Sequence, residues 1–585
     1  MNKVTFQKKV INFIKSNRLF LLLCLFIVPS FINLVQPGLY SMHDDIQAFR
    51  FQQMDKCFKD LQIPCRWIPD MGYQYGYPQF NFYPPSPYYV GTLIHQLGVQ
   101  FIDVTKIMFG LGFIVGGLGM YLFIKSWLGK WPAFVAAILY TYAPYKAANV
   151  YVRGAMSEYW AMSFYPFIFW SIYQFIKTRQ KKYGIFLALS VGGLIITHNL
   201  MPLIFLPLAA VWGLMWLILE KRIKLIGWLT GFGVLGILLA GFFIFPVIAE
   251  RPFVHLETII GGYFDYRMHF ASLYQLFVSN YWGYGSSVWG SWDGMSLSTG
   301  QVHALFSLVA VMLAVVQFKK YPKISVVTLI LFGLVLFVLF MIHQKSSFIW
   351  DKIPFLAYLQ FPWRFLSDSV FLLSVLGGIA IFYAEDIRLK LFGKIKAEYV
   401  LGIIVIAGVM ILHLPFFQGH NWKNITDQEK FSGTSWNKQL TISIFDYLPI
   451  YAELPPIQPA PAKPEILEGK SEVINWYKGS DWQYGTIDSS EGALVRLPLF
   501  DFPGMTVTVK TDGGEYVKVD HWNNDCRGQE FCLGLITFNL PPGYHEVNVH
   551  LENTPIRTIG NISSILAVIL LVVFWWIIQK EKKHA

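Results

Sequence analysis

Twelve apolar stretches, each about long enough to cross a bilayer as a helix, divide this chain of 585 residues. A helix needs roughly 20 apolar residues to cross the hydrocarbon core. The chain is 54% hydrophobic and 14% charged, whereas in typical soluble proteins about a quarter of all residues are charged. The pattern predicts a polytopic α-helical membrane protein with about 12 transmembrane helices. The candidate spans are residues 19–36, 105–124, 132–148, 158–177, 183–197, 200–218, 224–248, 303–318, 324–342, 364–384, 399–415 and 559–578.

Basic residues fall mainly in short turns on one side of these spans. Because cytoplasmic loops are enriched in Lys and Arg, we place those turns and the N-terminus inside. The formal net charge of +11 is therefore attributed to orientation, and no nucleic-acid partner is expected. The first span is expected to be an uncleaved anchor, because no small-x-small cleavage site follows Ser30. The basic turns lie at residues 3–18, 125–130, 177–182, 221–224, 319–323, 388–396 and 580–583.

The long segments on the other side divide the chain into three parts. Residues 1–415 are predicted to form a transmembrane domain with large outer loops at 37–104 and 249–302. Residues 416–558 contain a proline-rich linker and then short alternating runs separated by Pro and Gly turns, which predicts an extracytoplasmic β-sandwich-like domain. Residues 559–585 form a final helix and a basic cytoplasmic tail.

Four of the five cysteines form two closely spaced pairs on the side assigned as outer. Cys57 and Cys65 lie in the first outer loop, and Cys526 and Cys532 lie in the β-rich segment. Such pairs predict two local disulfides in an oxidising compartment, with four free thiols as the alternative. Their spacing is too wide for the CxxC signature of a zinc site.

Ionisable residues gather at the outer ends of the spans, beginning with the turn His43-Asp44-Asp45. Charged groups cannot lie in hydrocarbon without a large penalty, so these groups lie at the membrane surface or in a wet cavity. Adjacent residues of an extended loop point to opposite sides, so only one of the two aspartates is expected to act as a base. The other ionisable and polar candidates on this side are Arg153, Glu158, His198, Asn199, Arg267 and Arg364, with Tyr77 and Tyr83 in an aromatic, proline-rich stretch.

This set suits the transfer of a sugar from a polyprenyl-phosphate carrier. A carboxylate can take the proton of an acceptor hydroxyl, and arginines can hold the departing phosphate and neutralise its charge. No nucleotide is needed, because the donor already lies in the bilayer. The interpretation assigns donor-phosphate binding to Arg153, Arg364, His198 and Arg267, and assigns orienting or acceptor roles to His43, Glu158, Asn199, Tyr77 and Tyr83.

Each motif also has a purely structural interpretation. Asp44 and Asp45 could cap a helix that starts near Ile46. Arg153 and Glu158 could form a loop ion pair. His198 could be a satisfied histidine at a helix interface, and Arg364 could extend to the lipid headgroups.

Several short motifs, taken in order, resemble one known group of proteins. They are His43-Asp44-Asp45 with Arg50, Tyr75-Gly76-Tyr77-Pro78, Phe82-Tyr83-Pro84-Pro85, Arg153 with Glu158, Thr197-His198-Asn199, Gln360-Phe361-Pro362-Trp363-Arg364 and the segment 542–557. The chain resembles the bacterial membrane proteins called 6-pyruvoyl-tetrahydropterin synthase-related, and more distantly the YfhO-type and other GT-C superfamily glycosyltransferases.

The resemblance implies a GT-C-like fold and a lipid-phosphate-linked sugar donor. It implies that Asp44 is the base, with Asp45 as the alternative. Some members of the superfamily need a divalent metal. No dense set of metal ligands is present in the sequence, so no cofactor and a metal-independent reaction are expected.

The sequence therefore predicts an inverting membrane glycosyltransferase of the bacterial cytoplasmic (inner) membrane. Its donor would be a polyprenyl-phosphate sugar, and its acceptor an envelope glycan, lipid or protein on the extracytoplasmic face. One alternative is a transporter or flippase of lipid-linked sugars, for which charged groups near the midplane and broken helices are typical. Another is an assembly protein whose β-domain binds glycan without chemistry.

Overall fold

A computed structural model describes residues 17–290, 293–387 and 396–584, and in it a helix occupies each of the apolar stretches. By length and composition, six helices of the described residues can cross a membrane, or seven if α11 and α12 form one span. The α-helical membrane fold is therefore confirmed, and the number of twelve crossings stays a prediction. The helices at these stretches are Asn17–Ser30, α5 (Phe101–Leu128), α6 (Lys130–Thr141), α8 (Met156–Thr178), α9 (Lys181–Thr197), α10 (Met201–Leu219), α11 (Ile226–Leu239), α12 (Gly241–Ala249), α14 (Gln301–Val316), α15 (Pro322–Ile342), α17 (Leu366–Tyr383), α18 (Ala397–Leu412) and α21 (Pro555–His584).

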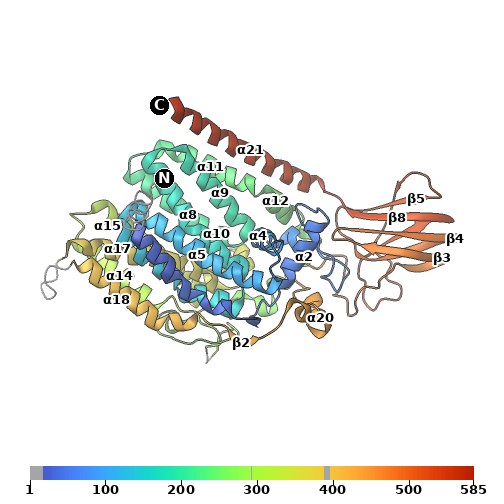
Figure 1. The fold of residues 1–585 in the computed structure, drawn as a ribbon, viewed down its shortest axis with the longest axis horizontal. Coiled ribbons are helices and arrows are strands. Elements are labelled where there is room, and N and C mark those ends of the chain that lie inside the picture. Colours follow the sequence, from blue (N-terminus) through green and yellow to red (C-terminus); the bar gives the residue numbers. More distant parts are fainter. Residues whose placement is uncertain (1–16, 291–292, 388–395, 585) are drawn as a thin grey trace, which may run out of the picture.

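The last helix, α21, runs from the β-strands back along the helical part of the molecule (Figure 1) and docks where α11 and α12 meet at a 74° bend. Ser564 Oγ accepts a hydrogen bond from the backbone N–H of Phe242 at 2.9 Å, and Ser563 Oγ donates to the carbonyl of Leu238 at 3.1 Å. A Cβ at Gly241 would lie 2.1 Å from Ser563 Oγ, so the close approach requires glycine there. The serines of α21 thus satisfy backbone groups that the bend frees, which unpaired would be costly in lipid.

The long loop of residues 37–104, called the first loop below, folds into a compact layer of short elements. Strand β1 (Leu39–Ser41) pairs antiparallel with β2 (His420–Lys423), so the turn after the first apolar helix is tied to a segment distant in sequence. The disulfide Cys57–Cys65 links the end of α2 (Gln47–Lys59) to the following loop, as predicted. The other short helices are α3 (Gln79–Phe82), α4 (Ser86–His95), α7 (Pro144–Ala147), α13 (Leu273–Phe277), α16 (Ser347–Lys352), α19 (Asp427–Lys430) and α20 (Gly433–Thr441).

Residues 420–452, called the returning segment, pack against the first loop. Besides the pairing of β2 with β1, Lys430 Nζ contacts Asp45 Oδ1 at 2.7 Å, and the Tyr77 hydroxyl donates to the carbonyl of Ile444 at 3.0 Å. The predicted domain boundary at residue 416 therefore precedes a segment that belongs by its contacts to the helical part. The long β-strands begin only at Glu465.

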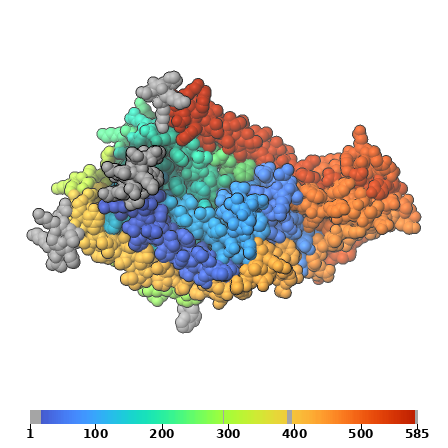
Figure 2. Space-filling view, in the orientation of Figure 1, coloured from blue at the N-terminus to red at the C-terminus, as the bar shows by residue number. Residues whose placement is uncertain are grey.

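Six strands form the predicted C-terminal β-rich domain, which includes the second predicted disulfide, Cys526–Cys532. The strand order is β3-β4-β8-β5-β6, and the first half of β4 pairs with β8 while its second half pairs with β7, so β4 connects two parts of the sheet. The sandwich-like arrangement stays a prediction. Trp67 and Tyr75 of the first loop share the core of these strands, and Figure 2 shows the first loop, in blue, between the helices and the strands, in orange. The strands are β3 (Glu465–Lys478), β4 (Trp482–Phe500), β5 (Met505–Thr511), β6 (Val517–Val519), β7 (Leu535–Leu540) and β8 (Gly543–Leu551).

Candidate active site

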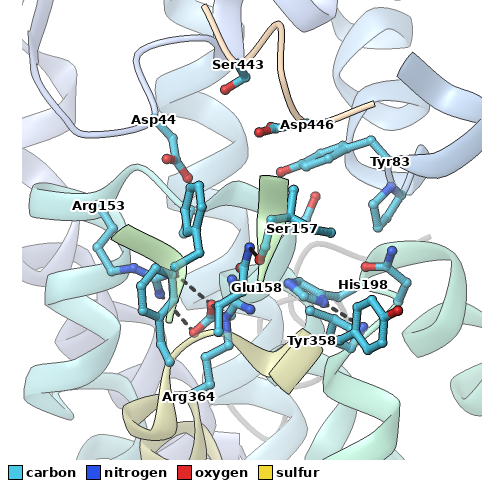
Figure 3. Close-up of a pocket in the computed structure, with 18 of the residues that line it drawn as sticks. Asp44, Tyr83, Arg153, Ser157, Glu158, His198, Tyr358, Arg364, Ser443 and Asp446 are labelled. Atoms are coloured by element: carbon cyan, nitrogen blue, oxygen red, sulfur yellow. Dashed lines mark hydrogen bonds and ion pairs between the residues drawn. The ribbon is translucent and has the colours of Figure 1, made fainter. Parts of the chain in front are cut away.

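A cavity of about 790 Å³ lies where the first loop, the start of α8, the turn between α9 and α10, the end of α12 and the returning segment meet. Many of the candidates from the sequence line it, and Figure 3 shows several of them around the space that they enclose. Those lining residues are His43, Asp44, Tyr83, Arg153, Glu158, His198, Asn199 and Arg364.

The turn that carries Asp44 is fixed to the chain just before α8. The backbone N–H of His43 donates to the carbonyl of Val152 at 3.0 Å, and that of Asp44 donates to the carbonyl of Arg153 at 2.8 Å. Gly154 follows with φ +68°, and a Cβ there would lie 2.4 Å from the sulfur of Met42, so this contact requires glycine. The two backbone hydrogen bonds place Asp44 beside the cavity.

The two adjacent aspartates have different surroundings. Asp44 lines the cavity, and no hydrogen bond or ion pair within the described part of the chain engages its carboxylate. Asp45 instead contacts Lys430, which is 3% exposed, at 2.7 Å. Of the two, Asp44 is thus the carboxylate that an incoming molecule can reach, whereas Asp45 holds the returning segment.

Three charged residues from distant elements form a buried cluster in the cavity wall. Glu158, in the first turn of α8, accepts from Arg153 Nη2 at 2.9 Å and from Arg364 Nε at 3.3 Å. Tyr145 also donates its hydroxyl to this carboxylate. Two guanidinium groups around one carboxylate leave a net charge of +1 in this part of the wall. An arrangement of this kind can bind an anion such as a phosphodiester through charge-assisted hydrogen bonds.

His198 lies in the turn between α9 and α10 and lines the same cavity. Its Nδ1 accepts hydrogen bonds from the backbone N–H groups of Leu200 at 3.0 Å and Met201 at 3.3 Å, so the ring proton sits on Nε2. Burial, reinforced by the positive charge of Arg364, lowers the pKa of His198 to about 3. His198 is therefore neutral near pH 7 and can donate a hydrogen bond to an anion without adding positive charge.

One side of the cavity is apolar. It is lined by Leu203 of α10 and by Ile244, Val247 and Ile248 of α12. The side chains of Leu203 and Ile248 are 39% and 61% exposed, so the apolar lining continues onto the outer surface of the helices. The cavity thus joins a polar, charged wall to an apolar helix surface.

Besides Asp45, two of the sequence candidates do not line the cavity. Arg267 is 60% exposed and pairs with Asp351 at 2.7 Å and Asp265 at 3.5 Å, outside the residues that line the cavity. Tyr77 is fully buried, and its hydroxyl contacts the returning segment. Arg267 is thus a surface ion-pair residue in this structure, and Tyr77 supports the cavity wall from behind.

Many lining residues were not among the sequence candidates for the site, and three of them bear on its chemistry. Arg50, 3% exposed, places its guanidinium 3.7 Å from the centre of the Tyr83 ring. Ser443 and Asp446 come from the returning segment. Arg50 stood in the quoted turn motif and could have been included, whereas Ser443 and Asp446 lie in no motif. Among the described residues, no three His, Cys, Asp or Glu side chains lie close enough together to hold a metal ion.

Fold and site together define a multi-pass membrane protein with a charged cavity that opens onto an apolar surface. The chain belongs to the family described as "6-pyruvoyl-tetrahydropterin synthase related domain; membrane protein", whose model matches residues 80–411, so the resemblance seen in the sequence is confirmed. The matched region includes Arg153, Glu158, His198 and Arg364 but neither Asp44 nor Asp446.

The chain is similar to several known proteins over part of its length. An uncharacterised protein of Lactococcus lactis subsp. cremoris (strain MG1363) is 22% identical over 351 residues, which are 57% of this chain and 51% of that protein. The arabinofuranosyltransferase AftD from mycobacteria is 14% identical with a TM-score of 0.42, over 68% of this chain and 27% of AftD. The oligosaccharyltransferase AglB from Archaeoglobus fulgidus, in complex with an inhibitory peptide and a dolichol-phosphate, is 14% identical with a TM-score of 0.39, over 70% of this chain and 57% of AglB. The chain thus spans about half of its sequence relative and less than two thirds of these solved structures.

Proposed function

We propose that this protein is an inverting membrane glycosyltransferase that moves a sugar from a polyprenyl-phosphate carrier to a cell-envelope acceptor. The observation that carries the proposal is the composition of the single cavity described above. An unpaired carboxylate, Asp44, faces the same space as the guanidinium groups of Arg153 and Arg364. That space continues onto an apolar helix surface where a lipid chain can lie.

In this reaction Asp44 takes the proton of the acceptor hydroxyl as the acceptor oxygen bonds to the anomeric carbon. The bond from that carbon to the phosphate oxygen breaks on the opposite face, and its electron pair leaves with the phosphate. Attack opposite the leaving group inverts the configuration of the sugar carbon. Arg153 and Arg364 hold the departing phosphate and neutralise its growing charge, while neutral His198 donates a further hydrogen bond.

The remaining parts of the cavity suit a donor that arrives from the bilayer. The aliphatic side chains of α10 and α12 would lie against the polyprenyl chain, and Glu158 would keep the two arginines in place. We propose that the reaction is independent of metal, because the arginines supply the charge that a cation would otherwise provide.

We place the site on the extracytoplasmic face of a bacterial inner membrane. Both disulfides belong to the segments around the cavity or to the β-rich domain, and disulfides persist in oxidising compartments. Basic residues gather on other turns: Lys177 and Lys323, from turns assigned as inner, both pair with Glu220, at 3.2 Å and 2.9 Å. The positive-inside rule orients such turns toward the cytoplasm.

Two observations favour a second candidate, a transporter of lipid-linked sugars. Lys146 and Asp368 are completely buried, and neither the Lys146 amine nor the Asp368 carboxylate has a hydrogen-bond partner among the described residues. The bend between α11 and α12 is also of the kind found in transporters. A transporter would not depend on a proton-accepting Asp44, which separates the two candidates.

The test compares cells that contain the protein, lack it, or contain only Asp44→Asn, by mass spectrometry of envelope glycans and lipid-linked sugars. The transferase predicts that the deletion and Asp44→Asn both lack one sugar decoration and accumulate its lipid-phosphate precursor. Normal decoration in Asp44→Asn cells, together with loss in the deletion, would favour the transporter instead.

A further inference from the structure

The wall of the cavity opposite the arginine cluster is built by the returning segment. Ser443 and Asp446 line the cavity there, and Figure 3 shows both side chains on the same side as Asp44, with Glu158 and Arg364 across the space. The cavity therefore has one wall that suits an anion and another that carries two carboxyl groups.

The first loop holds this part of the returning segment in place. The Tyr77 hydroxyl donates to the carbonyl of Ile444 at 3.0 Å and accepts from the backbone N–H of Tyr447 at 2.5 Å. These two residues flank Asp446, whose own backbone N–H donates to the carbonyl of Ser443 at 3.0 Å. Asp446 is thus set in a turn held by a fully buried tyrosine, so its position is determined by the fold.

The charges around Asp446 differ from those around an ordinary surface carboxylate. Burial raises its pKa to about 6, because the positive charge of Arg50 only partly offsets burial and the negative charge of Asp44 adds to it. The nearby Ser443 hydroxyl lowers this pKa, and the hydroxyl groups of Tyr77 and Tyr447 are the other ionisable neighbours of Asp446. Near pH 7 the group is therefore mainly a carboxylate, and below about pH 6 it is mainly neutral.

We propose that Asp446 and Ser443 form the acceptor subsite and that the acceptor is a polyhydroxylated sugar of an envelope glycan. This inference rests on the proposed glycosyl transfer. The reacting hydroxyl of the sugar faces Asp44, and a second hydroxyl of the same sugar donates a hydrogen bond to the Asp446 carboxylate. Asp446 binds the acceptor in this arrangement, and Asp44 receives the transferred proton.

The chemistry of this wall selects among acceptors. Two carboxylates offer acceptors for two O–H donors, which a sugar presents on neighbouring carbons. An acidic acceptor would be repelled by both carboxylates, and the guanidinium of Arg50 in the same wall disfavours a cationic amine. A neutral sugar satisfies the polar groups of this wall without leaving a buried charge unpaired.

The test measures transfer by the purified full-length protein in lipid vesicles. Lipid extract from a deletion strain supplies the donor, and oligosaccharides released from the undecorated glycan of that strain are the acceptor probe. Asp446→Asn is compared with Glu453→Gln, an exposed carboxylate on the same stretch of chain. We expect Asp446→Asn to raise the KM for the oligosaccharide by about tenfold or more, as for the loss of a hydrogen bond to a charged group. Its kcat should stay within about threefold, and Glu453→Gln should match the wild type.

The pH dependence gives a second readout that a merely structural role would not produce. The KM of the wild type should rise as the pH falls through about 6, because protonation of Asp446 removes the charged acceptor. Asp446→Asn should lack this rise. A lost kcat with unchanged KM would make Asp446 the base and overturn the proposal, as would an unchanged KM with an unchanged pH profile.

Oligosaccharide binding, measured without donor, separates this inference from the proposed function. Loss of binding in Asp446→Asn with no transfer by the wild type would keep the subsite and reject the transferase. Sugar transfer by the wild type that is unaffected by Asp446→Asn would keep the transferase and reject the subsite. If Asp446→Asn does not fold, as judged by its melting temperature and gel filtration, Ser443→Ala is used instead, with an expected rise in KM of a few-fold.

Discussion

The cavity and the β-rich domain differ in whether their charged side chains have ion-pair or hydrogen-bond partners. In the β-rich domain Arg496 bonds to Glu465 through Nε at 2.9 Å and Nη2 at 2.6 Å, and Lys510 bonds to Glu546 at 3.0 Å. In the cavity the Asp44 carboxylate has no such partner among the described residues, and the buried Nε of Arg50 has no hydrogen bond. The charges compared in the β-rich domain are thus paired, whereas in the cavity the Asp44 carboxylate and the Arg50 Nε lack partners beside the paired cluster of Glu158.

From this difference we infer that the cavity is the part of the molecule that binds a ligand. An enclosed charge without a partner costs stability and is retained where a ligand supplies the missing partner. Paired charges near a surface contribute little and are tolerant of change. Substitutions in the cavity should therefore affect activity strongly, and matched substitutions elsewhere should affect it weakly.

The largest effect is expected from the adjacent aspartates. Asp44→Asn should lower kcat by about 10²–10⁴-fold, because the amide cannot accept the acceptor proton. Asp45→Asn, which keeps its size and only weakens the contact with Lys430, is the matched control and should retain most activity. Rates of sugar transfer in vesicles measure both. Equal losses of kcat in Asp44→Asn and Asp45→Asn would contradict the choice of Asp44 over Asp45 as the base.

The next effect concerns two arginines that the sequence analysis placed in the same role. Arg364→Gln should lower kcat/KM for the lipid-phosphate donor by about 10²–10³-fold, as for the loss of a group that stabilises a departing anion. Arg267→Gln changes an exposed arginine outside the cavity and should leave the donor kinetics as in the wild type. A large loss in Arg267→Gln alone would show that the second long loop closes over the donor during the reaction.

Removing each disulfide in turn tests whether the cavity and the β-rich domain differ in their effect on activity when both lose stability. Removing either bond should lower the free energy of unfolding by about 2–3 kcal/mol, since both close short loops. Only the pair Cys57→Ser with Cys65→Ser should also lower turnover, because α2 carries Arg50 into the cavity. Melting temperature and transfer rate, measured on the same samples, separate stability from activity. Equal turnover in both double variants would argue against a role for α2.

The smallest effect is expected from the ion pair of the β-rich domain. Glu465→Gln should change the free energy of unfolding by less than about 1 kcal/mol, because Glu465 is 47% exposed and the buried Arg496 keeps its hydrogen bonds to the carbonyls of Asp525 and Arg527. Transfer should be unchanged. A clear loss of transfer in this variant would place the β-rich domain in the reaction and weaken the division between the two regions.

Much of the fold follows from local sequence patterns. Apolar runs place the helices, and alternating runs after a proline-rich linker place the strands. Most of the site also follows, because Asp44, Arg153, Glu158, His198 and Arg364 all lie at ends of apolar runs on one predicted side. Because these residues all lie on the same predicted side of the membrane, the sequence alone groups them, although it gives no distance between them.

What the sequence could not provide depends on contacts between distant segments. Ser443 and Asp446 reach the cavity because Tyr77 and strand β1 hold the returning segment, and no local pattern records this. Likewise, Arg267 donates a hydrogen bond to Asp351, which lies 84 residues further along the chain. The choice between Asp44 and Asp45 depends on the position of Lys430, which is also distant in sequence.

The central claim is that the cavity holds a lipid-phosphate sugar against Arg364 while Asp44 completes its transfer. It is tested most directly by mass spectrometry of the lipids that copurify with the Asp44→Asn protein. We expect this variant to retain a glycosylated polyprenyl phosphate that it cannot consume, and we expect Asp44→Asn with Arg364→Gln to lose it. Absence of any such lipid from the Asp44→Asn protein, or equal amounts in both variants, would contradict the account.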